Sequence, residues 1–549
     1  MSNYFQVMLQ WTLTPIFLPL FGVWAVESET CSSQGSCTSE YATFQFDGWE
    51  LPYGLFSNQL EEVEDYEMKV KVGAIPGFLD GSLYRIGAGM YHLEGERRVN
   101  NLIDALGKLH RWSFNTKTGR ASFSCKFIRS DIYNRTMQDR ELPPMPHMGQ
   151  TFPQLTTLQT LKIVLWDAKS DNTNVAVWNL GNTGVTTTTE QPLYLDHAYD
   201  SLNFLRKYVP PSDNKSAFTF EMLSASHFTR HPVSGNSINY KLTLPMDKGI
   251  FSGMNSPAYN IYEYTSSGSD DKVVASLIGS VPVASDDLRI VHSLGVTENF
   301  VVLPRFNMFL ERKSPVDIGA NIYWDASKPA VFDIVSIKTK KVTSFKFSAY
   351  EAQHIINSFE RVNSAGELEV VADFPTRVYP VDFSEETIYD VLNVDNWKKS
   401  NWKYSDDHEI DPSSKGRITR FIMNLNTGQG IETDFPVMWN APINTQVEFP
   451  IINPAYVGRA YCFTYMQVSN HELHSAAGIV KLDLCRETSV GWEQKNKFPV
   501  EPIFVARPGA LAEDDGVLMS PVFDSTNNST LYRFVCLGCE DSGGRGDSR

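Results

Sequence analysis

Short runs of apolar residues, separated by polar turns, dominate the chain from Glu62 onward. Typical runs are Ser82–Ile86, Val273–Ile278 and Phe300–Leu303, and turns such as Asp80–Gly81 lie between the runs. Runs of roughly four to eight β-branched, aromatic and aliphatic residues bounded by Gly, Pro, Asn or Asp are typical of β-strands. No long amphipathic helical pattern dominates any section. The pattern therefore predicts an all-β protein.

Chain length decides between the all-β architectures that this pattern permits. A chain of 549 residues is long for a single β-sandwich, so we expect a propeller, in which short sheets repeat around one axis. The sequence has no close repeat of the kind that marks WD40 or kelch blades. We therefore expect the repetition to lie in the structure rather than in the sequence.

The charge of the chain argues against nucleic acid as a partner. The formal net charge is −16, and the first basic residue is Lys69. Binding to a phosphate backbone needs clustered Lys and Arg. The N-terminal segment likewise has no basic residues that would attract anionic lipid headgroups.

Residues 1–25 form an apolar leader, and residues 26–62 are mainly polar. Val23-Trp24-Ala25 suits a signal-peptidase site, but the basic residues that usually precede a signal are missing. A cleaved signal, an uncleaved membrane anchor and a start without either role stay open. A signal would imply the secretory pathway or a membrane-associated location, and its absence would imply the cytoplasm.

The seven cysteines do not decide the compartment. Cys31 and Cys37 form a candidate local bridge, whereas Cys536 and Cys539 make a lone CxxC without a second pair at zinc-ligand spacing. We expect ordinary thiols at that CxxC. Sequons compatible with export occur at Asn134, Asn214, Asn527 and Asn528.

Residues 143–166 combine a loop rich in Pro and Met with leucines at roughly helical spacing. An exposed apolar helix there would make peripheral contact with a membrane and admit a lipophilic substrate. A buried connecting helix is the alternative, and we favour it slightly.

Three histidines occur in strand-like contexts at nearly equal intervals. His227, His292 and His354 are 65 and 62 residues apart. A radially repeated fold can deliver one inward-facing ligand per repeat to a common axis, where neutral imidazoles can hold a transition metal. The spacing therefore suggests a metal centre, and we expect iron.

Seven motifs follow one another along the chain, from about Val63 to Val522. They are Gly73–Gly89, Leu109–Phe114, His227–Gly235, Val291–Thr297, His354–Glu360, Glu448–Asn453, and Glu501–Val505 with Glu513–Gly516. Each motif is weak alone, but the series resembles the carotenoid cleavage oxygenase family, which includes the animal β-carotene oxygenases and the retinal isomerohydrolase.

This resemblance implies a seven-bladed β-propeller over residues 63–535, with helices and loops capping the face that bears a non-haem Fe(II). Four histidines hold the iron in that family, and glutamates support three of them. By position, the first three ligands match His227, His292 and His354. The supporting carboxylates match Glu190, Glu448 and Glu501. A buried glutamate that accepts the second ring N–H fixes the tautomer of a ligating histidine and raises its basicity.

The C-terminus departs from the family. Family members end with a fourth ligand in a Phe-His-Gly segment, but the 48 residues after Glu501 contain no histidine, and the last one is His474. We therefore expect three protein ligands, a weaker metal affinity, an incomplete last blade and a divergent, flexible tail at residues 536–549. Sites with three protein ligands do bind divalent metals.

The resemblance implies an Fe(II)-dependent enzyme that uses O2 to cleave a carbon–carbon double bond of a carotenoid or apocarotenoid. Two alternatives stay open: an enzyme similar to the retinyl ester isomerohydrolase, and a non-catalytic carotenoid- or retinoid-binding protein without the fourth ligand. His92 and His110 match no metal position of the family. We expect local hydrogen bonds at His92 and His110, and a surface loop at His471 and His474.

Overall fold

The computed structural model describes most of the chain between residues 58 and 535. The described residues are 5–8, 49, 58–70, 74–99, 102–145, 151–166, 171–180, 183–187, 193–196, 206–208, 219–245, 256–267, 272–311, 313–314, 319–377, 417–435, 445–470, 475–526 and 529–535. Within them, the α-helices are α1 (Asp131–Asp139) and α2 (Thr157–Trp166). Short 3-10 helices are η2 (Leu102–Asp104), η5 (Gly319–Asn321) and η7 (Pro454–Tyr456).

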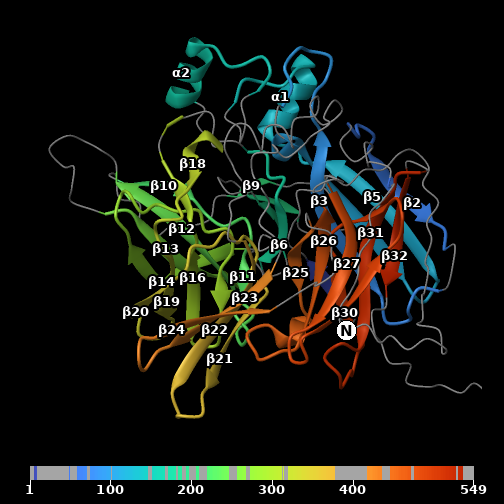
Figure 1. Ribbon diagram of the computed structural model, residues 1–549. Coiled ribbons are helices and arrows are strands. Elements are labelled where there is room, and N and C mark those ends of the chain that lie inside the picture. The colour runs from blue at the N-terminus through green and yellow to red at the C-terminus, as the bar shows by residue number, and fades with distance from the viewer. Residues whose placement is uncertain are drawn as a thin grey trace, which may run out of the picture.

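Seven sheets of four or five strands follow one another along the chain (Figure 1). In spatial order, the first sheet holds β1 (Phe5–Met8), β3 (Gly81–Met90), β4 (Leu106–Asn115), β5 (Arg120–Phe127) and β2 (Val63–Met68). The second holds β6 (Ala176–Leu180), β7 (Thr183–Thr187), β8 (Leu193–Asp196) and β9 (Arg206–Tyr208). The third holds β10 (Thr219–Leu223), β11 (Thr229–Arg230), β12 (Ser237–Pro245), β13 (Ala258–Ser267) and β14 (Lys272–Pro282).

The four remaining sheets repeat this meander. The fourth holds β15 (Gly295–Val296), β16 (Phe300–Arg305), β19 (Ala330–Ser336) and β20 (Val342–Phe347), with a separate hairpin of β17 (Met308–Leu310) and β18 (Ile322–Trp324). The fifth holds β21 (Asn357–Val362), β22 (Leu368–Thr376), β23 (Arg417–Asn424) and β24 (Gly430–Phe435). The sixth holds β25 (Thr445–Ile451), β26 (Phe463–Asn470), β27 (Ser475–Asp483) and β28 (Thr488–Glu493). The seventh holds β29 (Lys497–Pro499), β30 (Ile503–Ala506), β31 (Gly516–Asp524) and β32 (Ser529–Val535).

Buried apolar clusters join each sheet to the next and close the ring. Residues of adjacent sheets that belong to the same cluster are, from sheet one to sheet seven in sequence, Ile86 and Val177, Trp178 and Tyr262, Ile261 and Val301, Phe332 and Phe421, Val371 and Met466, and Tyr465 and Phe504. Trp112 and Met519 then share a cluster that joins the seventh sheet to the first. Because the contacts return to their start, the sheets are the blades of a seven-bladed propeller, and the expected all-β fold is confirmed.

In two blades, the first row of strands is interrupted near its middle. In the third blade, β10 and β11 both pair with β12, and residues 224–228 separate them. In the seventh blade, β29 and β30 both pair with β31, and residues 500–502 separate them. An interruption frees the chain from the alternating pleat, so side chains there can turn toward a common centre.

The seventh blade has three strand rows within the described residues, whereas blades two to six have four. β32 pairs with the edge of β31 opposite β29 and β30, since Val522 and Asp524 pair with both sides. The expected incomplete last blade stays a prediction, because the residues that follow β32 are not described. Residues 536–549, where we expected a divergent tail, lie outside the described part.

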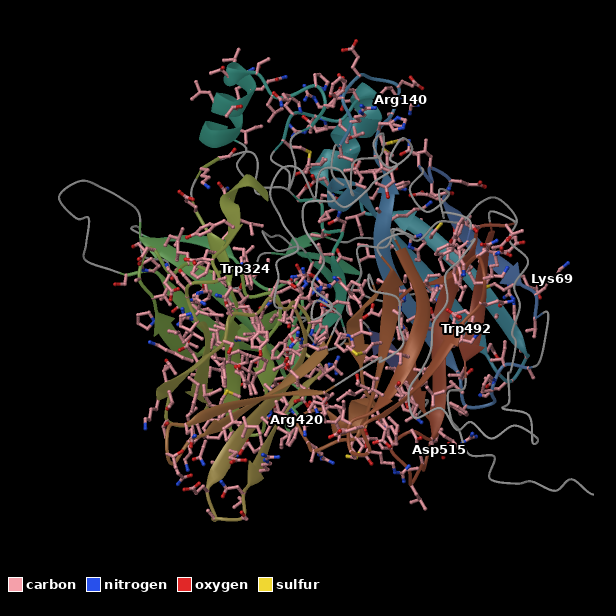
Figure 2. The ribbon with its side chains drawn as sticks, viewed as in Figure 1. Lys69, Arg140, Trp324, Arg420, Trp492 and Asp515 are labelled. Atoms are coloured by element: carbon pink, nitrogen blue, oxygen red, sulfur yellow. A yellow bond between two sulfur atoms is a disulfide. The ribbon has the colours of Figure 1, made fainter. Side chains whose placement is uncertain are left out.

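Both helices lie at one face of the propeller (Figure 1). Figure 2 marks this face by Arg140, which caps α1, and the opposite face by Asp515. α2 is exposed along part of its length, since Leu158 is 64% and Leu161 is 51% exposed, although Ile163 is buried. The favoured interpretation of a buried helix is therefore wrong for these two leucines. Neither described helix has the length and apolar character that crossing a membrane requires.

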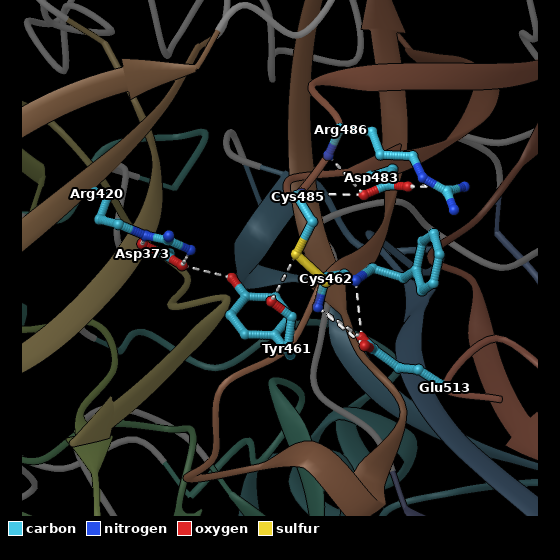
Figure 3. Close-up of a disulfide and its surroundings, with 9 residues drawn as sticks. Asp373, Arg420, Tyr461, Cys462, Asp483, Cys485, Arg486 and Glu513 are labelled. Atoms are coloured by element: carbon cyan, nitrogen blue, oxygen red, sulfur yellow. Dashed lines mark hydrogen bonds and ion pairs between the residues drawn. A yellow bond between two sulfur atoms is a disulfide. The ribbon is translucent and has the colours of Figure 1, made fainter. Parts of the chain in front are cut away.

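A disulfide joins Cys462, just before β26, to Cys485, just after β27 (Figure 3). The neighbouring Tyr461 donates its hydroxyl to Asp373 in the fifth blade, and Glu513 in the seventh blade accepts the backbone N–H of Cys462. The bridge therefore lies at the junction of three blades. Its 23-residue spacing gave no sequence signal for this pairing.

The structure describes little of the N-terminal leader. Phe5–Met8 forms β1, which pairs in parallel with Gly81–Tyr84 of β3. Cys31 and Cys37 lie outside the described residues, as do the sequons other than Asn134. The boundaries at residues 25, 62 and 535, and the role of the leader, stay predictions.

Candidate metal centre

The three predicted histidines come from consecutive blades. His227 lies in the break between β10 and β11, His292 lies just before β15, and His354 lies just before β21. These segments belong to the first strand rows of the third, fourth and fifth blades. The side chains meet, so the first rows face a shared centre.

The Nε2 atoms of the three imidazoles converge on one point. His227 Nε2 lies 3.0 Å from His292 Nε2, which lies 3.1 Å from His354 Nε2. A metal–nitrogen bond of about 2.1 Å and an angle of about 90° between two bonds place the two nitrogens about 3 Å apart. All three ligand atoms lie within 4.8 Å of one another. The arrangement therefore fits a single metal ion.

Hydrogen bonds between blades hold the backbone that carries these histidines. Thr229 Oγ1 donates to the carbonyl of Leu294 at 2.8 Å. Ser293 Oγ donates to the carbonyl of Gln353 at 2.6 Å and accepts the N–H of Ile355 at 3.0 Å. Sequence reasoning missed Thr229 and Ser293, although both lie within two residues of a predicted ligand.

Burial keeps His227 and His292 uncharged. It lowers the pKa of His227 well below its usual value, and the adjacent His292 and His354 add to this shift. Burial also lowers the pKa of His292, with a further contribution from His354. Because an imidazole must be neutral to bind a metal, these surroundings prepare both side chains for coordination.

Glu448, one of the supporting carboxylates that the resemblance implies, contacts His354. Its Oε2 lies 2.8 Å from His354 Nδ1, and both side chains are buried. Burial disfavours the charged carboxylate, but His354, its hydrogen bond, Arg377 and the Phe449 N–H together lower the pKa of Glu448. The carboxylate accepts the Nδ1 proton, so the Nε2 lone pair of His354 faces the centre.

Glu501 has different surroundings. It lies in the break between β29 and β30, where Arg85 Nη1 of the first blade lies 3.6 Å from its Oε2. The Arg85 guanidinium also donates to the backbone carbonyl of Glu501. Burial raises the pKa of Glu501 to about 8, although Arg85 opposes the shift, and Glu448 adds to it. Among the described residues, no histidine donates a hydrogen bond to Glu501.

The other predicted residues lie apart from the centre or outside the described chain. Glu190 falls on residues that the structure does not describe, so its support of a ligand stays a prediction, as does the loop at residues 471–474. His92 Nδ1 lies 3.3 Å from the carbonyl of Leu93, which confirms local bonding. His110 is buried on β4, and burial lowers its pKa to about 3. No other described residue hydrogen-bonds His227 Nδ1 or His110 Nδ1.

A second cluster of metal-ligand types occurs at Cys462, Asp483 and Cys485. The two sulfurs are bonded to each other, so neither is a thiolate ligand. Asp483 Oδ1 accepts hydrogen bonds from the backbone N–H groups of Cys485 and Arg486. The carboxylate therefore stabilises a local turn. Within the described part of the chain, the three-histidine cluster is therefore the group that fits a metal.

A seven-bladed propeller in which three histidines from neighbouring blades meet at one centre defines a class of proteins, the metal-dependent propellers. The sequence profile of the retinal pigment epithelial membrane protein (RPE65) family matches residues 56–538. The chain therefore belongs to the RPE65 and carotenoid cleavage oxygenase family.

Curated relatives match most of the chain. It is 25% identical to chloroplastic carotenoid cleavage dioxygenase 8 of Arabidopsis thaliana over 490 residues, which covers 85% of this chain and 79% of the relative. It is 24% identical to the beta,beta-carotene 15,15'-dioxygenase of Mus musculus over 521 residues, which covers 86% of this chain and 84% of the relative.

Solved structures share the fold. Cobalt-substituted Synechocystis apocarotenoid oxygenase matches with a TM-score of 0.66 and 20% identity, covering 87% of this chain and 91% of that one. A chimera of that oxygenase and RPE65 matches with a TM-score of 0.65 and 18% identity, and the match covers 88% of this chain and 97% of the chimera. These matches support the propeller assignment.

Proposed function

We propose that this protein is an Fe(II)-dependent dioxygenase that cleaves a carbon–carbon double bond of a carotenoid or apocarotenoid. The observation that carries the proposal is the convergence of the Nε2 atoms of His227, His292 and His354, of which His227 and His354 are buried and His292 is half-buried. Cleavage consumes one O2, breaks the double bond and gives two carbonyl products, so the atoms balance without another reductant.

The ligand set suits ferrous iron. Three neutral imidazoles would hold the ion without neutralising its charge, and they would leave coordination positions open. When bound, such an ion supplies the activation of O2 that the cleavage needs. A supporting carboxylate raises ligand basicity, and Glu448 takes this role for His354.

Burial of His227 and hydrogen bonds between the blades hold the centre in place. His227 is 0% exposed, and the Thr229 and Ser293 hydroxyls bridge the segments that carry the ligands. A fixed centre lets geometry select the bond that is cut, since the alkene carbons of a polyene are chemically similar. The names of the plant and animal relatives support a carotenoid as the substrate class.

The test is an aerobic assay of the purified protein loaded with Fe(II), using β-carotene and an apocarotenoid and analysing products by chromatography and mass spectrometry. We expect aldehyde or ketone products that carry oxygen from 18O2. The control is His354→Ala, which we expect to form none. A loaded protein that retains pigment without cleaving it would contradict the proposal and favour a binding protein, and hydrolysis of a retinyl ester instead would favour the isomerohydrolase alternative.

A further inference from the structure

Phe449 has a backbone conformation that is unusual for its residue type. Its φ is +58°, in the left-handed region that favours glycine. The other described non-glycine residues with positive φ are polar or charged: Asp65, Arg140, Lys340, Glu487 and Asn496. A bulky residue held there is strained, and such strain persists where the surrounding structure requires it.

The conformation brings two consecutive side chains to one histidine. In a regular strand, neighbouring side chains point to opposite faces. Here the pairing register of β25 shifts between Glu448 and Ile451, as at a β-bulge. Glu448 consequently bonds His354 Nδ1, and the Phe449 ring also packs on the His354 ring, with 4.9 Å between the ring centroids.

The backbone of Phe449 contacts the same carboxylate. Its N–H donates to Glu448 Oε2 at 2.6 Å, the oxygen that also lies 2.8 Å from His354 Nδ1. One residue therefore contacts both members of the pair, the carboxylate through its backbone and the imidazole through its ring. The ring is half-buried, and a ring contact of this kind restricts rotation of the imidazole.

We propose that Phe449 is a positioning residue that fixes the plane and tautomer of His354 for metal binding. The inference rests on the proposed metal centre and deepens it. Glycine would adopt this backbone conformation without strain, but it has no ring to pack on His354. The side chain therefore explains why a strained phenylalanine occupies the position.

The first test uses the metal-free protein, with the 15N shifts of the His354 ring as the readout. In the wild type we expect the proton on Nδ1. Phe449→Tyr keeps the ring and should preserve this tautomer. Phe449→Leu and Phe449→Gly remove the ring, and Phe449→Gly also relieves the backbone strain, so both should give a mixture of tautomers. A single Nδ1–H tautomer in both variants would overturn the proposal.

The second test is a titration with Co2+, followed by the visible absorption of the bound ion. We expect Phe449→Leu and Phe449→Gly to weaken binding by about 10-fold, in the range of lost ligand support, and Phe449→Tyr to restore it. Phe345→Leu is the matched control, because it removes a buried ring of the core between the fourth and fifth blades. It should leave the titration unchanged.

The outcomes separate this inference from the metal centre itself. A wild-type protein that does not bind Co2+ would overturn the metal centre, while the 15N shifts would still test the positioning role. Wild-type binding together with unchanged affinity in Phe449→Leu and Phe449→Gly would overturn the role of Phe449 alone.

Discussion

Glu448 and Glu501 lie on the first strand rows of neighbouring blades, and the family resemblance implies the same role for both, yet their partners differ. Glu448 bonds the imidazole of His354, and its pKa is lowered. Glu501 faces the Arg85 guanidinium, and burial raises its pKa to about 8. Burial acts on both carboxyls in the same direction, so the difference lies in which groups oppose it. A motif can specify a buried carboxylate without specifying its partner.

Of the changes considered, loss of His292 should have the largest effect on metal binding. Its Nε2 lies within 3.1 Å of both other ligand atoms, so His292→Ala removes the central member of the cluster. We expect this variant to retain no iron after dialysis, as measured by elemental analysis, with a folded circular dichroism spectrum. Wild-type iron content in the variant would refute the ligand assignment.

Removal of the disulfide should separate fold stability from the metal centre. Closing a 23-residue loop contributes about 3 kcal/mol in the loop-entropy account. The double variant Cys462→Ala/Cys485→Ala should lose about this much free energy of unfolding in urea, with unchanged Co2+ affinity. If the folded double variant lost much of its Co2+ affinity, the disulfide as well as Glu448 would be needed to hold His354 in place.

Glu448→Gln and Glu501→Gln form a matched pair that tests the comparison directly. Glu448→Gln removes the carboxylate that fixes His354, so we expect metal affinity to fall by about 10- to 100-fold, as for other lost ligand supports. Glu501→Gln should cause a smaller loss, since its described partner is Arg85. Isothermal titration with Co2+ measures both, and equal losses would restore equal roles for the two carboxyls.

The pH dependence of stability should have opposite signs at the two sites. The Glu501 pKa rises from 4.5 to about 8 on folding. Its stabilising contribution is therefore complete below about pH 4.5 and is lost as pH rises toward 8. Glu448, with a lowered pKa, loses its contribution as pH falls. The free energy of unfolding of Glu501→Gln, measured in urea across this pH range, should not show the loss that the wild type shows as pH rises. A pH dependence parallel to that of the wild type would contradict the raised pKa of Glu501.

The sequence predicted the elements that depend on local pattern. The strand runs from Ser82, Val273 and Phe300 are strands in the structure, because alternation and turn residues act locally. The convergence of the three histidines was also predictable, since one residue per blade recurs at nearly constant spacing. The resemblance then supplied the position of Glu448.

Other features depended on contacts that the sequence does not encode locally. Arg85 meets Glu501 only because the first and seventh blades close the ring. The left-handed backbone conformation of Phe449 occurs at a β-bulge, and the sequence around it has no turn residue that would predict the bulge. The Cys462–Cys485 bridge joins positions that two strands bring together. The exposure of Leu158 depends on the placement of α2, which helical spacing alone could not fix.

X-ray absorption spectroscopy of the iron-loaded protein tests the central claim most directly. The account predicts back-scattering from three imidazole ligands, matching His227, His292 and His354, and the loss of one imidazole contribution or of the metal in His354→Ala. A spectrum with sulfur neighbours, or without imidazole scattering, would contradict it.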